Sequence, residues 1–80
     1  MDVAYASQAR HFLRLLDTGL AERITERVKE LRIQPFTDVK RLQNSPYFSS
    51  RVGNCRIVYA VDQARSLLEI VRIDKRENVY

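Results

Sequence analysis

The hydrophobic period changes near the middle of this 80-residue chain, and the change limits the possible folds more than any other feature. In the first half, apolar residues recur at the i, i+3, i+4, i+7 spacing of one helix face. From Tyr47 onward the period becomes two, which is typical of strands. Because the two patterns are segregated, the sequence predicts one α+β domain over residues 1–80, with a helical hairpin packed on a small, mainly antiparallel sheet.

Two helices and one strand are expected in the first half. The first helix begins at Ser7, a suitable N-cap, and Gly19 suits the left-handed residue that commonly ends a helix. The second helix stops before Pro35, because proline disfavours helical geometry in the preceding residue. The two apolar stripes consist of Ala9, Phe12, Leu13 and Leu16, and of Leu20, Ile24, Val28 and Leu31. Ahead of both helices, Asp2–Tyr5 is short and rich in β-formers, so we expect a strand there.

The second half is expected to form three further strands. They are predicted over Tyr47–Val52, Cys55–Val61 and Leu67–Ile73. The resulting sheet has three to four strands. Residues 35–46 hold both prolines and form a connecting loop, with one helical turn at Asp38–Leu42. The run Leu67–Ile73 is apolar at nearly every position, which is typical of an inner strand covered on both faces.

A predicted hairpin loop at Gly53-Asn54 fixes where two arginines lie. A two-residue loop pairs Val52 with Cys55 and sets Arg51 directly opposite Arg56. Like charges facing each other across a strand pair repel, at a cost of about 0.2–1 kcal/mol. The neighbours of Arg56 on its own face are small, so we expect a shallow concavity with an exposed guanidinium floor. Such a face suits a phosphate ligand; the alternative is a solvated rim of unrelated cations.

The distribution of charge points to the same end of the chain. Fourteen Lys and Arg residues against ten Asp and Glu give a net charge of +4, with +1 in residues 1–40 and +3 in residues 41–80. A basic half suits a polyanionic partner such as nucleic acid. Lys75 and Arg76 leave the last strand beside the strand of Arg56, so an anionic ligand would be held from two directions.

Composition disfavours several other kinds of protein. The single cysteine, Cys55, can form neither an intramolecular disulfide nor a multi-cysteine zinc site, and we expect a small buried hydrophobe. No apolar stretch is long enough to span a bilayer, and the first residues lack a secretory signal. We therefore expect a reducing cytoplasm and no membrane. The only histidine, His11, lies on the polar side of the first helix and is expected to be solvated.

Two segments carry a family resemblance. The hairpin Arg51-Val52-Gly53-Asn54-Cys55-Arg56 and the tail Arg76-Glu77-Asn78-Val79-Tyr80 are similar to motifs of the RelE/ParE toxin superfamily. The order of strand, helical hairpin and sheet is also similar, so the resemblance covers nearly all 80 residues. The hairpin is shared with ParE-like relatives, whereas the tail favours the RelE branch.

The resemblance implies a toxin of a type II toxin–antitoxin pair that cuts mRNA in the ribosomal A site, without a metal or another cofactor. Arg51 and Arg56 would stabilise the phosphate, Arg76 would stabilise it or protonate the leaving oxygen, and Tyr80 would orient or activate the 2′-hydroxyl. The further RNA contacts that we expect are Lys75, Arg72, Lys40 and Arg41. The implied partners are a RelB-like antitoxin, the 30S A site and mRNA.

Two positions depart from the family pattern. Ser49 stands where the best-studied RelE branch has a second basic residue, and Asp74 replaces a common glycine and adds a negative charge beside Lys75. A tyrosine phenol with a pKa near 10 is a poor base at neutral pH, so the sequence leaves open whether Tyr80 or Lys75 is the base. Two rival functions remain: a ParE-like toxin that blocks DNA gyrase by binding without cleavage, and a non-catalytic module that docks on RNA.

Overall fold

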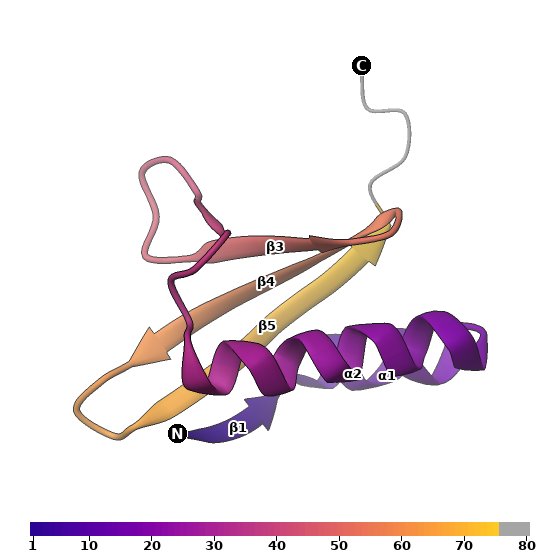
Figure 1. Cartoon of the computed structure of the whole chain (residues 1–80), viewed down its shortest axis with the longest axis horizontal. Coiled ribbons are helices and arrows are strands. Elements are labelled where there is room, and N and C mark those ends of the chain that lie inside the picture. The colour runs from indigo at the N-terminus through magenta and orange to yellow at the C-terminus, as the bar shows by residue number, and fades with distance from the viewer. Residues whose placement is uncertain (76–80) are drawn as a thin grey trace.

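The computed structural model describes residues 1–75, which form two helices and a five-stranded sheet (Figure 1). In chain order the elements are β1 (Asp2–Tyr5), α1 (Ser7–Leu15), α2 (Thr18–Ile33), β2 (Lys40–Arg41), β3 (Phe48–Val52), β4 (Cys55–Asp62) and β5 (Leu67–Lys75). The strands lie in the order β1-β5-β4-β3-β2, with β1 parallel to β5 and every other pair antiparallel. The predicted α+β class, the N-terminal strand and the inner position of β5 are confirmed.

The sheet has one strand more than the three to four that the sequence predicts. Strand β2 pairs with β3 within the segment that was expected to be a loop, so the predicted helical turn at Asp38–Leu42 is wrong. Asp38 has a φ of +56°, a left-handed conformation that a right-handed helix does not accept. The two residues of β2 are both basic and show no apolar alternation, so the hydrophobic pattern of the sequence does not indicate this strand.

The break between the helices differs from the prediction. Leu16 is extended and ends α1, and the Asp17 side chain caps α2 by accepting a hydrogen bond from a backbone N–H of the first turn at 3.0 Å. Gly19 therefore lies inside the first turn of α2 and does not end α1. Ala6, not Ser7, is the N-cap of α1, and no side chain caps it. Neither helix in residues 1–75 is long and apolar enough to cross a membrane.

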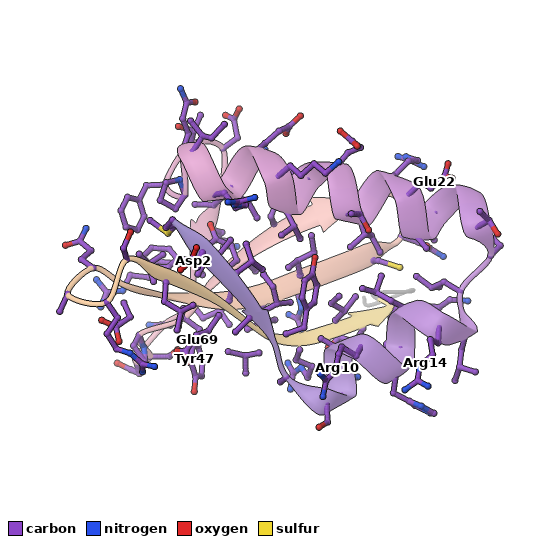
Figure 2. The ribbon with its side chains drawn as sticks, turned by 90° about the horizontal axis from the view of Figure 1, so that it is seen from below. Asp2, Arg10, Arg14, Glu22, Tyr47 and Glu69 are labelled. Atoms are coloured by element: carbon purple, nitrogen blue, oxygen red, sulfur yellow. The ribbon has the colours of Figure 1, made fainter. Side chains whose placement is uncertain are left out.

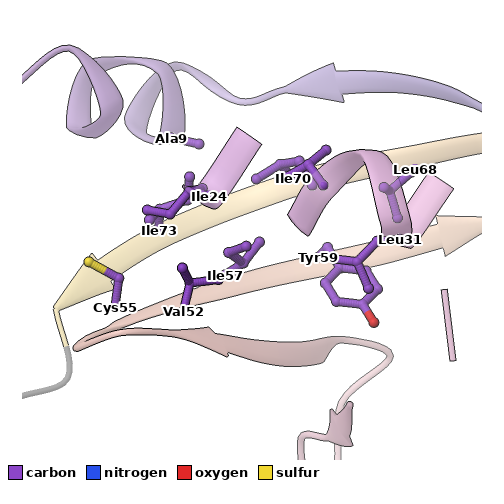
Figure 3. Close-up of a cluster of buried hydrophobic side chains, with 11 residues drawn as sticks. Ala9, Ile24, Leu31, Val52, Cys55, Ile57, Tyr59, Leu68, Ile70 and Ile73 are labelled. Atoms are coloured by element: carbon purple, nitrogen blue, oxygen red, sulfur yellow. The ribbon is translucent and has the colours of Figure 1, made fainter. Parts of the chain in front are cut away.

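Both helices lie on one face of the sheet (Figure 1). We call this the covered face, and we call the other, over which neither helix lies, the open face. Figure 2 views the molecule from the helix side, with Arg10 and Arg14 on α1 and Glu22 on α2. The buried core between helices and sheet (Figure 3) consists of Ala9, Ile24, Val28, Leu31, Val52, Cys55, Ile57, Tyr59, Leu68, Ile70 and Ile73. Burial of each large apolar side chain contributes about 1.5–3 kcal/mol, so the side chains of this single core layer together stabilise the fold.

Candidate functional site

The β3–β4 hairpin places two arginines opposite each other on the open face. Gly53 has a φ of +60° at the first position of the two-residue loop, a conformation that glycine adopts readily. The register pairs Val52 with Cys55 and Arg51 with Arg56, as predicted. Since Val52 and Cys55 belong to the core, the alternation of side chains along each strand directs Arg51 and Arg56 to the open face.

A β-bulge in β5 adds charged residues of a third strand to this face. Tyr59 pairs with Ile70, but its neighbour Val58 pairs with Arg72. Val71 therefore has no partner on β4 and is the extra residue of the bulge. A shift of one residue exchanges the faces of a strand, and Arg72 and Asp74 therefore lie on the open face. The apolar run of β5 reflects this change of face. It does not reflect burial on both faces, as the sequence predicted, since Arg72 is exposed.

Two cross-strand rows on the open face bring basic side chains together. One row consists of Arg51, Arg56 and Asp74, and the next consists of Lys40, Ser49, Val58 and Arg72. We define the basic patch as Lys40, Arg51, Arg56 and Arg72. Its four cations come from β2, β3, β4 and β5 in turn. In these two rows the four cations outnumber the one carboxylate, Asp74, so the net charge is positive, on a face that no helix covers, and the potential suits a polyanion.

Asp74 directs its carboxylate into the basic patch. Its Oδ2 atom lies 3.3 Å from Arg56 Nη2 and 3.0 Å from Arg72 Nε. The side chains of Arg56 and Asp74 are 25% and 31% exposed. The exposed guanidinium floor that we expected at Arg56 is therefore replaced by an ion pair, because the sequence did not indicate that Asp74 faces Arg56 across the β4–β5 pair.

The other predicted site residues lie elsewhere or outside the described residues. Arg41 and Lys75 pair with residues that belong to the covered face, so the register assigns them to that side of the sheet. Arg41 Nε also donates a hydrogen bond to Ser45 O at 3.4 Å. The candidate catalytic residues Arg76 and Tyr80 lie outside residues 1–75, the part of the chain that the structure describes. Their roles, like the RNA contacts of Arg41 and Lys75, stay predictions.

Sequence patterns missed Gln8, which holds the end of β5 that carries Asp74. Its side-chain Oε1 accepts a hydrogen bond from Ile73 N at 3.1 Å, and its Nε2 donates one to Ile73 O at 3.0 Å. Strand β1 pairs with β5 only as far as Ile70, so this amide replaces a strand neighbour for Ile73. The contact joins residues 65 positions apart. No local signal in the sequence could have identified it.

The remaining reactive side chains serve the fold. Burial raises the pKa of the Cys55 thiol, which keeps it protonated at neutral pH. Burial also raises the pKa of Tyr59 to about 12, and its hydroxyl donates a hydrogen bond to Pro35 O. His11 is exposed on α1, as expected. Within residues 1–75 no three His, Cys, Asp or Glu side chains are grouped to hold a metal ion. Among the described residues, the open face therefore offers guanidinium and ammonium groups together with the carboxylate of Asp74.

The sequence matches a family model along nearly its whole length. The model is described as "ParE toxin of type II toxin-antitoxin system, parDE", and it matches residues 3–80. A comparison with curated protein sequences gave no match.

Solved structures share the fold. A chain of a RelBE toxin–antitoxin complex from Mycobacterium tuberculosis has 27% sequence identity and a TM-score of 0.84, and the match covers 94% of this chain and 96% of that one. A chain of the archaeal RelE–RelB complex from Pyrococcus horikoshii has 21% identity and a TM-score of 0.85, with 98% and 97% covered. The YoeB/ParE toxin from Agrobacterium tumefaciens has 20% identity and a TM-score of 0.82, with 94% and 98% covered. The same arrangement of helices and sheet thus recurs among RelE-like and ParE-like proteins.

Proposed function

The chain belongs to the ParE toxin family of type II toxin–antitoxin systems, within the RelE/ParE superfamily, and from this premise we propose that it is a ribosome-dependent mRNA endoribonuclease. The observation that carries the proposal is the basic patch on the open face. RNA phosphates bind guanidinium groups through paired oxygens, and Arg51, Arg56 and Arg72 offer three such groups. The ribosome and mRNA place this activity in the cytoplasm.

The reaction is a phosphate transfer within the RNA chain. The ribose 2′-oxygen attacks the adjacent phosphorus while its proton passes to a base. The bond from phosphorus to the 5′-oxygen breaks as that oxygen gains a proton. The products are a 2′,3′-cyclic phosphate and a free 5′-hydroxyl. Arg51 and Arg56 stabilise the negative charge that gathers on the phosphate oxygens in the transition state.

The proton transfers are assigned to the end of the chain. Arg76 protonates the leaving oxygen or binds the phosphate, and Tyr80 accepts the proton of the 2′-hydroxyl. Lys75, the other candidate base, is assigned by the register to the covered side of the sheet. Lys40 and Arg72 contact the neighbouring RNA backbone from the open face, whereas the register assigns Arg41 to the covered side, away from these contacts. The ribosome orients the message, and positioning of this kind supplies a large part of an enzyme's acceleration.

A second candidate function is inhibition of DNA gyrase by binding, without cleavage. Two observations favour it. The matching family model carries the ParE description. Asp74 partly neutralises Arg56 and Arg72, which lowers the positive charge available to a transition state.

Purified translating ribosomes with a defined mRNA separate the two candidates. We expect discrete cuts at the A-site codon by the wild-type protein, with 2′,3′-cyclic phosphate ends. Arg56→Ala and Arg76→Ala should each lower the cutting rate by about 100-fold, the usual loss when one donor to a transition-state oxyanion is removed. Both variants should bind ribosomes nearly as well as the wild type.

Arg65→Ala is the matched control. Arg65 is exposed in the loop after β4 and pairs with Asp62 at 3.8 Å, far along the strand from Arg56, so cutting should be unchanged. Intact message together with inhibited supercoiling would establish the gyrase inhibitor instead. Cutting that survives both Arg56→Ala and Arg76→Ala would refute the assigned roles.

The partner in the cell is a cognate antitoxin. Structures that share this fold include RelBE and RelE–RelB complexes, which supports the assignment. We propose a RelB-like helix that covers apolar surface and masks part of the basic patch. Among residues 1–75, four large apolar side chains are exposed and available for such a contact: Leu15, Ile33, Phe36 and Tyr47. Co-expression with the gene next to it should give a stable complex that no longer cuts mRNA.

A further inference from the structure

An acidic side chain lies within the basic patch. Asp74 faces Arg56 across the β4–β5 pair, and Arg56 faces Arg51 across the β3–β4 pair. A single oxygen, Asp74 Oδ2, lies 3.3 Å from Arg56 Nη2 and 3.0 Å from Arg72 Nε. It thus takes the place that one phosphate oxygen would take between the same two guanidinium groups.

The ion pair is incompletely formed. A guanidinium and a carboxylate bind most strongly through two parallel hydrogen bonds that use both carboxylate oxygens. Within residues 1–75, Arg56 Nε and Asp74 Oδ1 are buried and have no hydrogen-bond partner. The 3.3 Å contact also exceeds the usual length of about 2.7–2.9 Å for a charged pair. A phosphate that bound these guanidinium groups through two oxygens would hold them better than Asp74 does.

We propose that Asp74 is an internal competitor of RNA phosphate. Its carboxylate occupies the anion position between Arg56 and Arg72, and bound RNA displaces it. The nature of the ligand, an RNA backbone, rests on the proposed function. The competitor lowers the affinity for free RNA, so that productive binding needs the additional positioning that the ribosome provides.

A purely structural role of Asp74 predicts the opposite sign. If Asp74 served to orient Arg56 and Arg72 for RNA, its loss would weaken RNA binding. If it competes with phosphate, its loss strengthens RNA binding. Asp74→Asn distinguishes the two roles because the amide keeps the shape of the side chain and removes its charge.

The test measures binding of a single-stranded RNA with 2′-O-methyl groups on every ribose, which the protein cannot cut. By fluorescence anisotropy of the labelled RNA, Asp74→Asn should bind about tenfold more tightly than the wild type, since one charge next to the phosphate is removed. Asp62→Asn is the matched control. It removes the same charge from an aspartate that also pairs with an arginine, at the other end of β4. It should bind within about twofold of the wild type. Equal or weaker binding by Asp74→Asn overturns the proposal.

A second measurement uses the wild-type protein and does not depend on how the variant folds. The Nε–H signals of Arg56 and Arg72 are assigned by NMR with Arg→Lys variants, and the same RNA is then titrated into the wild type. Displacement of Asp74 should move both signals together. Unmoved signals at a saturating RNA concentration contradict the proposed competition.

The competitor role and the endoribonuclease assignment can fail separately. If ribosome-bound mRNA stays intact while Asp74→Asn still binds RNA more tightly, the cleavage assignment is wrong and the competitor role stands. If the wild type cuts mRNA while Asp74→Asn gains no affinity, only the competitor role is wrong. If neither protein binds the RNA, the competitor role is also refuted.

Discussion

The covered and open faces of the sheet differ in what their side chains contact, although the same strands supply both. On β4, Ile57 and Tyr59 are fully buried beneath the helices, whereas Arg56 lies between Arg51 and Asp74. Apolar burial gives the covered face about 1.5–3 kcal/mol for each large side chain. A partly exposed ion pair such as that of Arg56 contributes only about 0–1 kcal/mol. Under the proposed function, the covered face supplies most of the stability and the open face binds the ligand, so single substitutions should separate the two properties.

The largest expected effect comes from the covered face. Ile57→Ala should lower the free energy of unfolding by about 2–5 kcal/mol, because it removes buried methyl groups and leaves a cavity. Urea unfolding followed by circular dichroism measures the loss. In a domain of this size the variant can fail to fold, so Ile57→Val serves as the graded control, with an expected loss of about 0.5–1.5 kcal/mol. A loss below that of Ile57→Val would show that the covered face does not carry the stability.

The covered face is also the part of the fold that the sequence predicts well. The stripe residues Ile24, Val28 and Leu31 are all buried, as their helical spacing indicated. The alternation of β4 likewise assigned its two faces correctly, because burial imposes a period on the sequence. The wrong helix break and the wrong helical turn at Asp38–Leu42 both fall on residues that are exposed or only partly buried. One Asp17 side-chain hydrogen bond decided where α2 starts, and Gly19 looked like a better stop.

A pH titration tests how tightly the covered face encloses Tyr59. Burial favours the neutral phenol, so the unfolded chain, with a pKa near 10, releases this proton before the folded chain, with a pKa of about 12. The stabilisation is fully present below pH 10 and is lost as the pH rises to 12. It amounts to at most about 3 kcal/mol over two pH units.

Tyr59→Phe is the control for that titration, since it lacks the titrating group. Urea unfolding of both proteins between pH 9 and 12 should show a steeper decline for the wild type. Tyr5 is present in both proteins, so its own raised pKa does not enter the difference. Parallel curves would mean that Tyr59 titrates alike in the folded and unfolded chains.

A polar contact inside the covered face should rank next. Arg27 Nε donates a hydrogen bond to Ser50 Oγ at 2.7 Å, and Arg27 Nη2 donates one to Thr37 O at 3.1 Å, which ties α2 to β3 and to the following loop. Ser50 is only 3% exposed. Arg27→Ala leaves its hydroxyl without this donor and should lower the free energy of unfolding by about 2 kcal/mol.

Lys29→Ala is the matched control for Arg27→Ala. Lys29 is exposed on the same helix and pairs with Glu26 at 3.2 Å, so its loss should change the free energy of unfolding by no more than about 0.5 kcal/mol. Urea unfolding of the two variants side by side gives the comparison. Equal effects would show that the Arg27 contacts add nothing to an ordinary surface ion pair.

The open face could be predicted only in part. The two-residue loop at Gly53-Asn54 fixed the Arg51–Arg56 pair, since the loop sets the register of a hairpin. The β4–β5 pair depends on the bulge at Val71, and without that bulge Arg56 would face Ile73 in place of Asp74. No residue type marks a bulge in an apolar run. The ion pairs of Asp74 therefore required the structure.

The smallest expected effect breaks the simple division of the sheet into a stabilising and a binding face. Arg51 and Arg56 repel each other, so Arg51→Thr should raise the free energy of unfolding by about 0.2–1 kcal/mol while it weakens RNA binding. Arg65→Thr removes the same charge where no cation lies opposite, and should change neither stability nor binding appreciably. The measurements are urea unfolding and RNA anisotropy on the same samples. A residue that lowers stability and yet strengthens RNA binding is explained by selection for the ligand. If Arg51→Thr is less stable than the wild type, or binds RNA as well as the wild type, Arg51 has a structural role instead.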